Sequence, residues 1–246
     1  MRIELDHVRK AFGRTVAVKD AVLSVASGER VGLVGPNGSG KSTLIRVLMG
    51  VVDFEGRATL DGLHPMRDRD LLAPRMAYVP QIAPRLAAPV SELVRAIADV
   101  RDVEVAHVRS VARRLDLDID AVASKPFRDL SGGTKQKLLL ALALSKPAEL
   151  YVMDEPTASL DVGARARFFE LYEEVAPKAT LLLCTHRADE MDRLAQRIVT
   201  LADGVVTSSE VVEVRGPPGA GDRPSPSAGS DARSPRLHVV HGGRHG

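Results

Sequence analysis

The chain has 246 residues, which is enough for one sizeable domain or for one domain with a smaller lobe. Apolar residues make up 44%, but aromatics are only 3% and Trp is absent, so a buried core must rest on Val, Leu, Ile and Ala. The net charge of +2 does not indicate a nucleic-acid partner. From Arg215 onward the chain carries +3, from five Arg against two Asp, which leaves −1 for the rest.

Cysteine content and hydropathy indicate the kind of cellular compartment and whether the chain spans a membrane. The single cysteine, Cys184, excludes an internal disulfide and fits a reducing compartment. The first ten residues contain no apolar signal segment. The longest apolar run covers residues 138–144, far fewer than the roughly 20 residues that cross a bilayer. We therefore expect a chain that does not span a membrane alone.

The first part of the chain reads as strands with one helix. Polar and apolar side chains alternate at the start, which is typical of a half-buried strand. Strands are predicted at residues 2–8, 16–29, 30–35 and 56–62. A helix begins at Lys41, directly after a glycine-rich loop, and Gly50 is expected to stop it.

Helical patterns dominate the middle, and we expect residues from about 85 to 145 to form a helical lobe inserted into an α/β core. Ser91 is a good candidate for the N-cap of its first helix. The apolar face of that helix is Leu93, Val94 and Ile97. A second amphipathic helix has apolar residues at helical spacing, namely Val108, Val111, Ala112 and Leu115.

Strand and helix alternation then resumes and ends in a segment of different composition. Strands are predicted at 150–154, 180–184 and 197–201, and a helix carries Phe168, Leu171, Tyr172 and Val175. We place the folded domain at residues 1–214 and expect the Gly/Pro/Ser/Arg-rich tail, 215–246, to be disordered. The tail holds His238, His241 and His245. A solvated tail end is favoured over a metal site, since no acidic or Cys ligand accompanies them.

The sequence GPNGSGKST, residues 35–43, fits the phosphate-binding pattern G-x-x-x-x-G-K-[ST]. Glycines let backbone N–H groups surround phosphate oxygens, and the following helix directs its positive dipole end to the same place. Lys41 adds a charge at the β- and γ-phosphates, and the Ser42 hydroxyl can ligate Mg²⁺. A glycine-rich turn of chance composition is the alternative, but the loop lies between a predicted strand and a predicted helix.

Two further motifs narrow the class of nucleotide-binding protein to which this chain could belong. Asp154 and Glu155 end a hydrophobic strand, where Asp154 would hold Mg²⁺ and Glu155 would polarise an attacking water. A plain surface edge is the alternative. Ser131, Gly132 and Gly133 precede an apolar helix and form a second anion-binding type of helix start. This second site has no Lys and no metal ligand beside it, so we do not expect it to bind a nucleotide of its own.

Together these motifs resemble the ATP-binding cassette (ABC) family, over about residues 1–214. GPNGSGKST matches its Walker A motif, LSGGT its signature and VMDE its Walker B motif with the catalytic glutamate. Other positions match by order and spacing: Gln81 at the Q-loop, Ser159 and Asp161 at the D-loop, His186 at the H-loop and Phe12 at the adenine-stacking aromatic. Each of these last positions also has an ordinary structural reading, as a loop or core residue.

The resemblance implies a P-loop NTPase core with an antiparallel β subdomain and the inserted helical lobe. Two such domains would pack head to tail, so that each ATP lies between Walker A of one and the signature of the other. The implied catalytic residues are Glu155, His186 and Lys41, and the implied Mg²⁺ ligands are Ser42, Gln81 and Asp154. The implied ATP-binding residues are Phe12, Gly35, Pro36, Asn37, Gly38, Ser39, Gly40, Lys41, Ser42, Thr43 and Gln81.

One position departs from the family pattern: Thr134 stands where the signature usually has Gln, so dimer contacts are expected to differ. The variant LSGGTKQK is similar to signatures of exporter-type cassettes. Three classes of function are weighed. The favoured one is the ATPase subunit of a transporter at the cytoplasmic face of the membrane, working with a second nucleotide-binding subunit and separate membrane subunits. The others are a soluble assembly or repair ATPase and a regulatory module without turnover. No nucleic acid is expected.

Overall fold

A computed structural model describes residues 1–212 of the chain. The domain boundary predicted at residue 214 and the histidines of the tail lie outside these residues and stay predictions. The strands are β1 (Ile3–Phe12), β2 (Thr15–Val25), β3 (Arg30–Val34), β4 (Glu55–Leu60), β5 (Met76–Val79), β6 (Leu150–Asp154), β7 (Thr180–Cys184), β8 (Arg197–Ala202) and β9 (Val205–Val211). The α-helices are α1 (Lys41–Leu48), α2 (Arg69–Leu72), α3 (Val90–Arg101), α4 (Val105–Arg114), α5 (Gly132–Leu144), α6 (Val162–Val175) and α7 (Ala188–Leu194).

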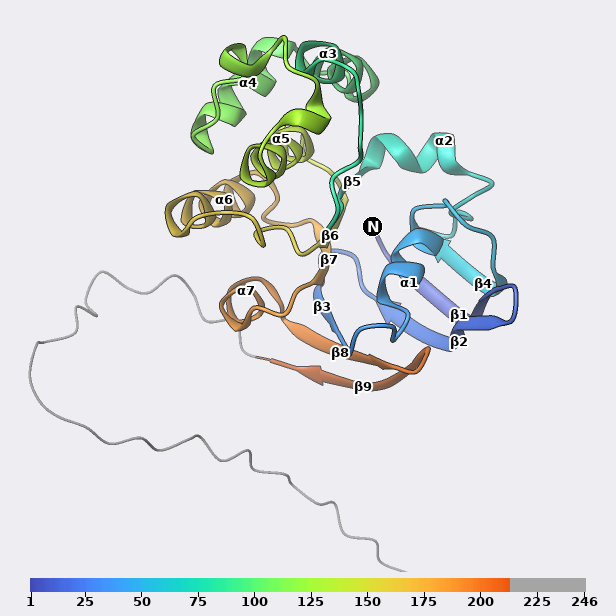
Figure 1. Cartoon of the computed structure of the whole chain (residues 1–246). Helices are drawn as coiled ribbons and strands as arrows, with labels where there is room; N and C mark the ends of the chain where they lie inside the picture. Colours follow the sequence, from blue (N-terminus) through green and yellow to red (C-terminus); the bar gives the residue numbers. More distant parts are fainter. Residues whose placement is uncertain (213–246) are drawn as a thin grey trace, which may run out of the picture. The chain divides into compact units, whose positions relative to one another are not determined.

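Within residues 1–212 the strands form one nine-stranded sheet in the order β4-β1-β2-β9-β8-β3-β7-β6-β5. The strands β8, β3, β7, β6 and β5 run parallel, whereas β4, β1 and β2 pair antiparallel. Figure 1 shows the parallel strands at the centre, with helices on both sides. The α/β class predicted from the sequence, with its antiparallel part, is therefore confirmed.

Continuous apolar runs in the central strands follow from burial on both faces. Along β6, Tyr151 and Met153 belong to the core under α3–α6, while Leu150 and Val152 belong to the core shared with α1 and the antiparallel strands. The run Leu181–Cys184 in β7 alternates between the two cores in the same way and is fully buried. These two cores hold the carboxyl ends of the parallel strands at one edge, where open α/β sheets bind ligands.

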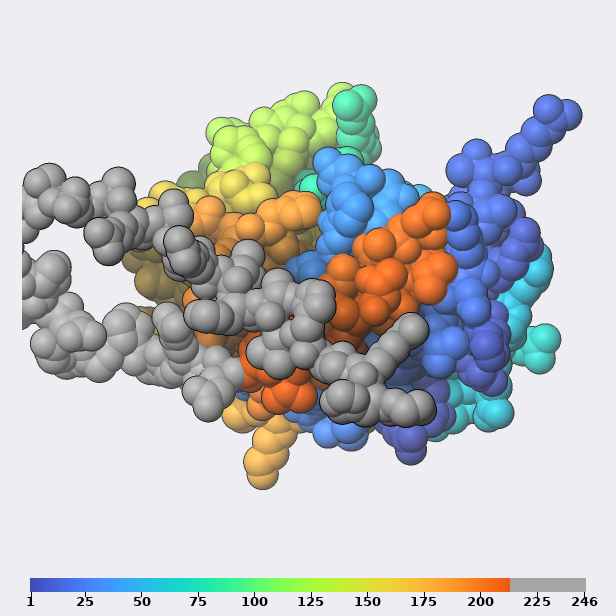
Figure 2. Space-filling view, turned by 90° about the horizontal axis from the view of Figure 1, so that it is seen from below, coloured from blue at the N-terminus to red at the C-terminus, as the bar shows by residue number. Residues whose placement is uncertain are grey.

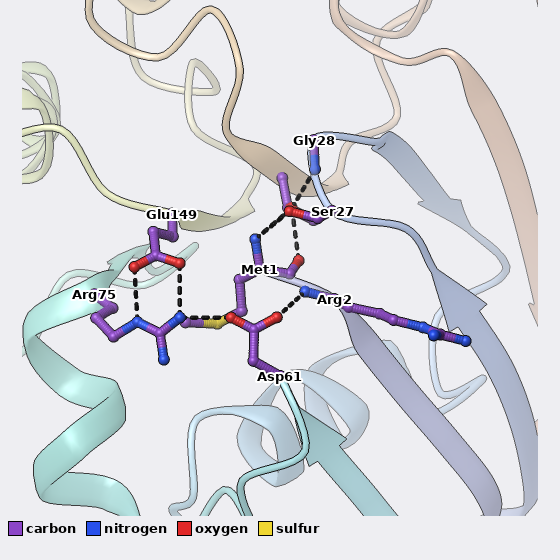
Figure 3. Close-up of polar contacts among 8 residues, drawn as sticks. Met1, Arg2, Ser27, Gly28, Asp61, Arg75 and Glu149 are labelled. Atoms are coloured by element: carbon purple, nitrogen blue, oxygen red, sulfur yellow. Dashed lines mark hydrogen bonds and ion pairs between the residues drawn. The ribbon is translucent and has the colours of Figure 1, made fainter.

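The antiparallel part is tied to the parallel part by a polar cluster near the start of the chain (Figure 3). Arg75 donates from Nε and Nη2 to the two carboxylate oxygens of Glu149, each at 2.7 Å, and also contacts Asp61. The hydrogen bonds from Arg75 hold the pKa of Glu149 below its usual range, and against the effect of burial the Arg2 amide and Arg75 lower the pKa of Asp61. Because Glu149 directly precedes β6, the cluster fixes the strand that ends in Asp154.

Figure 1 shows α3, α4 and α5 together at one end of the described part, above α6. Their apolar faces pack into a common core, and the spacing predicted for α4 is confirmed, since Val108, Val111 and Ala112 are buried. The helix predicted after the glycine loop also ends as expected, because Gly50 takes φ 63° just beyond it. The longest of these helices have 12 to 14 residues, and within residues 1–212 none is long and apolar enough to cross a membrane.

One capping prediction was wrong. The N-cap of α3 is Pro89, and Ser91 lies inside the first turn without capping it. Proline fixes φ near the value that a helix start needs and leaves no N–H to satisfy, so the helix begins one residue before the expected cap. The amide of Ser91 instead donates to the carbonyl of Ala123, which ties α3 to the loop after α4.

Candidate functional site

The glycine-rich loop joins β3 to α1 and depends on close backbone approach. Gly35 has φ 154°, and a Cβ there would lie 2.0 Å from the carbonyl oxygen of Leu201 in β8. Gly40, at φ 105°, is the N-cap of α1, and its Cβ would lie 2.5 Å from the carbonyl oxygen of Ala17. Only glycine fits these positions. The turn between β8 and β9 holds the loop from outside, since the Gly204 amide donates to the Ser39 carbonyl at 3.0 Å (orange beside blue in Figure 2).

A pocket of about 250 Å³ opens at this loop. It gathers the loop residues with side chains that follow β5, β6 and β7, far apart in the sequence but adjacent at one edge of the sheet. The lining residues are Ala17, Asn37, Gly38, Ser39, Gly40, Lys41, Ser42, Thr43, Gln81, Asp154, Glu155 and His186. Most of the residues that the sequence assigned to ATP, to Mg²⁺ and to catalysis therefore lie together.

Lys41 is held at the loop by its own backbone. Its Nζ donates to the carbonyl oxygens of Gly35 at 2.6 Å and Pro36 at 3.1 Å. Residues Gly35 and Pro36 thus act through their carbonyls, although they do not line the pocket. The N-terminus of α1 points at the same place, so a positive charge and free backbone N–H groups converge where an anion can bind.

Two carboxylates at the end of β6 face this positive region. Asp154 is only 6% exposed, and burial raises its pKa, with the neighbouring Glu155 charge adding to the effect. Lys41 opposes this shift. Glu155 adopts the left-handed conformation, φ 50°, and its amide donates to the Cys184 carbonyl at 2.8 Å. Such a strained residue directly after a strand is typical of functional sites, because the surrounding structure must enforce it.

The third group is contributed by the segment after β7. The His186 Nε2 lies 3.6 Å from Glu155 Oε1, and the histidine side chain is 63% exposed. The Thr185 hydroxyl donates to the other oxygen, Glu155 Oε2, at 3.4 Å. Glu155 is therefore contacted on both carboxylate oxygens by consecutive residues. Thr185 was missed in the sequence, where only His186 was singled out, because a Thr after a strand carries no distinctive pattern.

The signature residues lie on a different surface. Ser131 is the N-cap of α5, and its Oγ accepts from the Thr134 amide at 3.2 Å, as the sequence suggested for a helix start. Gly133 lies against Ser159, since a Cβ on the glycine would approach the Ser159 carbonyl oxygen to 3.0 Å. Asp161 caps α6 by accepting from the Ala164 amide at 2.8 Å. We call Ser131, Gly132, Gly133, Ser159 and Asp161 the signature surface, and none of them lines the nucleotide pocket.

A second cavity, of about 570 Å³, lies between the nucleotide pocket and the signature surface and shares one lining residue with the pocket. Gln81 lines both it and the pocket at the glycine loop, while Gly132 and Ser159 line only the second cavity. Phe12 lines neither. It lies at the end of β1, 45% exposed, with the Lys10 ammonium 5.0 Å from its ring centroid. The adenine-stacking role that the resemblance implies for Phe12 stays a prediction.

The residues present fit a nucleotide with a divalent cation. The buried Ser39 hydroxyl has no hydrogen-bond partner in the described residues, which suits a loop that surrounds an anion. Ser42, Gln81 and Asp154 line one pocket and supply hydroxyl, amide and carboxylate oxygens, the ligand type that Mg²⁺ prefers.

Comparison with known proteins agrees with this geometry. The family model described as ABC transporter matches residues 18–158, a range that holds the glycine loop, Gln81, the signature and both carboxylates. The chain belongs to the ABC transporter family. The resemblance drawn from its motifs is confirmed, and membership supports ATP binding and ATPase activity. Phe12, Ser159, Asp161 and His186 lie outside the matched range.

Curated relatives of this ABC protein are ATP-binding proteins. The Nod factor export ATP-binding protein I of Bradyrhizobium diazoefficiens is 40% identical over 215 residues, covering 83% of this chain and 68% of that protein. The methionine import ATP-binding protein MetN of Brucella abortus is 33% identical over 218 residues, covering 83% of this chain and 58% of the relative. The chain therefore spans between about half and two thirds of the length of these relatives.

Solved structures give the same fold. The structure described as the ATP-binding subunit of an ABC transporter superposes with a TM-score of 0.77 at 25% identity, covering 86% of this chain and 90% of that one. A bacterial Atm1-family ABC exporter with ATP bound gives 0.76 at 24% identity, over 85% of this chain and 38% of that chain. The second likeness concerns the fold alone.

Proposed function

We propose that this chain is the ATP-hydrolysing subunit of an ABC transporter and that it uses Mg²⁺-ATP. The observation that carries the proposal is the single pocket in which Lys41, Asp154, Glu155 and His186 meet. A cationic loop beside paired acids at the ends of parallel strands is suited to phosphoryl transfer, where positioning and charge stabilisation supply most of the catalysis.

In this mechanism water attacks the γ-phosphorus in line with the bond to the leaving ADP. Glu155 orients the water and accepts its proton, and His186 contacts the γ-phosphate from the neighbouring strand end. Lys41 and the loop amides stabilise the charge that spreads over the phosphoryl oxygens. Ser42, Gln81 and Asp154 would hold Mg²⁺, which when bound neutralises charge on the β- and γ-phosphates.

The second half of the proposal is a head-to-tail dimer. Ser131 and Gly133 would meet the γ-phosphate of the ATP held by a second nucleotide-binding subunit, here a second copy of this chain, with Ser159 and Asp161 at the contact. The proposal is supported by the separation of the signature surface from the pocket and by its exposure, since Ser131, Gly132, Ser159 and Asp161 are all exposed. ATP would then hold two copies together until hydrolysis releases them.

The test is Glu155→Gln. Because the amide cannot accept the proton, we expect turnover to fall by about 100-fold or more, while ATP-held dimers persist. Glu170→Gln, an exposed carboxylate on α6, is the matched control and should hydrolyse ATP at the parent rate. Steady-state phosphate release and size-exclusion chromatography with ATP give both readouts. Parent-like turnover in Glu155→Gln would show that the role given to Glu155 is wrong.

Coupling to transport requires separate membrane subunits. We infer that these contact the second cavity, where Ile82 is 81% exposed and Arg85 and Arg128 line the wall. The relatives are named for export as well as for import, so the proposal concerns the ATP-driven step that both share. A gentle-detergent pull-down of Glu155→Gln with ATP should recover a polytopic membrane protein in stoichiometric yield. Recovery of soluble partners only would favour the assembly-ATPase alternative.

A further inference from the structure

A fully buried carboxylate lies beside the nucleotide pocket without lining it. Glu190, in α7, is 0% exposed and has no place in the mechanism above. Removing a charged group from water costs several kcal/mol unless it is paired and hydrogen-bonded. A chain that keeps such a group next to its reaction centre must gain something from its polar contacts.

The contacts of Glu190 are few and specific. Its Oε1 accepts a hydrogen bond from the Thr157 hydroxyl, and the Arg187 Nε lies 3.6 Å from the same oxygen. The other oxygen, Oε2, is buried and has no hydrogen-bond partner in the described residues. Burial raises the pKa of this carboxyl, and the Glu155 and Asp189 charges add to the shift, which the Thr157 hydroxyl opposes. The side chain is therefore poorly compensated for a purely structural role.

Glu190 connects the two segments that carry the reacting side chains. Thr157 follows Glu155 by two residues, on the segment that leaves β6. On the other side, the Arg187 amide donates to the Thr185 hydroxyl at 3.1 Å, and that hydroxyl donates to Glu155. The N-cap residue of α7 thus reaches Glu155 through Thr185, while Glu190 within the helix holds the segment beyond Glu155.

We propose that Glu190 is a positioning residue that ties the segment after β6 to α7 and so fixes Glu155 relative to His186. The inference rests on the proposed function, because it acts through those two residues. Glu155 needs such a tie, since its left-handed backbone is unfavourable for a non-glycine residue and reverts unless the neighbouring chain is held. A displacement of about 1 Å at a reacting group can lower a rate by about 100-fold.

The first test replaces the carboxylate by an apolar side chain of similar length, Glu190→Met. We expect kcat to fall by about 10-fold or more with the KM for ATP unchanged, since Lys41 and the glycine loop are not touched. The Tm should change little, because removal of a poorly compensated buried charge offsets the cost of leaving the buried Thr157 hydroxyl without its acceptor. Glu190→Gln keeps an acceptor for Thr157 and should restore most of kcat. A lower kcat at an unchanged KM and Tm distinguishes a positioning role from a structural role. In a structural role, stability and activity would fall together.

The second test replaces Thr157, the hydrogen-bond partner of Glu190. Thr157→Val removes the donor without changing the shape, so it should lower kcat as Glu190→Met does, and the double variant should lose little more. This variant decides the question if Glu190→Met does not fold. Ser145→Ala, which removes another buried hydroxyl that donates to the Leu142 carbonyl, is the control and should keep the parent kcat.

Three results would overturn the inference: a parent-like kcat in Glu190→Met or Thr157→Val, a loss of kcat matched by an equal loss of ATP affinity, or a Gln variant as slow as the Met variant. The proposed function fails separately, through parent-like turnover in Glu155→Gln. A loss of turnover in Glu155→Gln together with parent-like Glu190 variants would remove only the positioning role.

Discussion

The nucleotide pocket and the signature surface each contain the N-terminus of a helix, but the residues around the two helix ends differ. At α1 the helix start carries Lys41 and faces the acids at the end of β6, Asp154 and Glu155. At α5 the helix start carries Ser131 with two glycines, and the neighbours are Ser159 and the cap residue Asp161. Free helix-end amides attract anions in both places, but only the first combines them with a lysine and paired carboxylates.

This difference supports a division of labour between two copies of the chain. The pocket has the groups needed to hold a nucleotide and activate water within one chain. The signature surface offers amides and a hydroxyl to an anion that something else must bring. Gln81 lines both the pocket and the adjoining cavity, so a change at the phosphate end of the pocket has a direct route to the cavity beside the signature.

The largest effect is expected at the pocket. Lys41→Met removes a charged donor to the phosphates, so ATP affinity of the isolated chain should fall by about 100-fold. Lys135→Met is the control, since Lys135 lies in the first turn of α5, lines only the second cavity and donates to the Arg128 carbonyl. It should bind ATP like the parent, as measured by calorimetry under conditions where the chain is monomeric. Equal losses in both variants would contradict the assignment of the nucleotide to α1.

A smaller effect is expected at the signature surface, and only in the dimer. Ser131→Asn keeps a good N-cap side chain for α5 but places a larger group where the second ATP would approach. In the Glu155→Gln background we expect ATP-dependent dimers to weaken by about 10-fold, which corresponds to about 1.4 kcal/mol. Binding of ATP to one chain should be unchanged. Sedimentation with and without ATP measures the first and calorimetry the second.

Ser131→Ala distinguishes a role of Ser131 in the dimer from its role as the N-cap of α5. It removes the cap as well as the hydroxyl, so it should lower stability by about 1 kcal/mol in addition to weakening the dimer. If Ser131→Asn dimerises like the parent while Ser131→Ala does not, the role of Ser131 is confined to capping α5. The head-to-tail contact would then lie elsewhere.

The pocket was largely predictable because its groups come from short contiguous motifs at strand ends. A glycine pattern between a strand and a helix fixes where Lys41 lies, and an apolar strand running into Asp154 and Glu155 fixes the acids. Parallel strands bring such ends to one edge of the sheet, so separate motifs meet without any further information. The fold class followed from the same alternation of strands and helices.

What the sequence did not give depends on tertiary contacts. The start of α3 was misplaced because a serine is a good cap in general, whereas the local backbone placed Pro89 there. Strands β5 and β9 and the helix α7 were not predicted, since they are short and acquire their pairing from distant segments. Nothing in the sequence separates Glu190 from the other acids near it. Only its burial against Thr157 shows that it differs from the exposed acids around it.

The smallest effect is expected for Phe12, which belongs neither to the lining of the nucleotide pocket nor to the signature surface. The residue is 45% exposed and does not line the pocket, and the Lys10 ammonium lies 5.0 Å from the centroid of its ring. If adenine stacks on this ring, Phe12→Ala should weaken ATP binding to one chain by about 3-fold, the usual size of an aromatic contact, and Phe12→Tyr should restore it. Val22→Ala, an exposed apolar residue on β2, should have no effect. Unchanged affinity in Phe12→Ala would leave the phosphates as the anchor of ATP in this chain, because the charged groups of the pocket would then supply the whole of the measured binding.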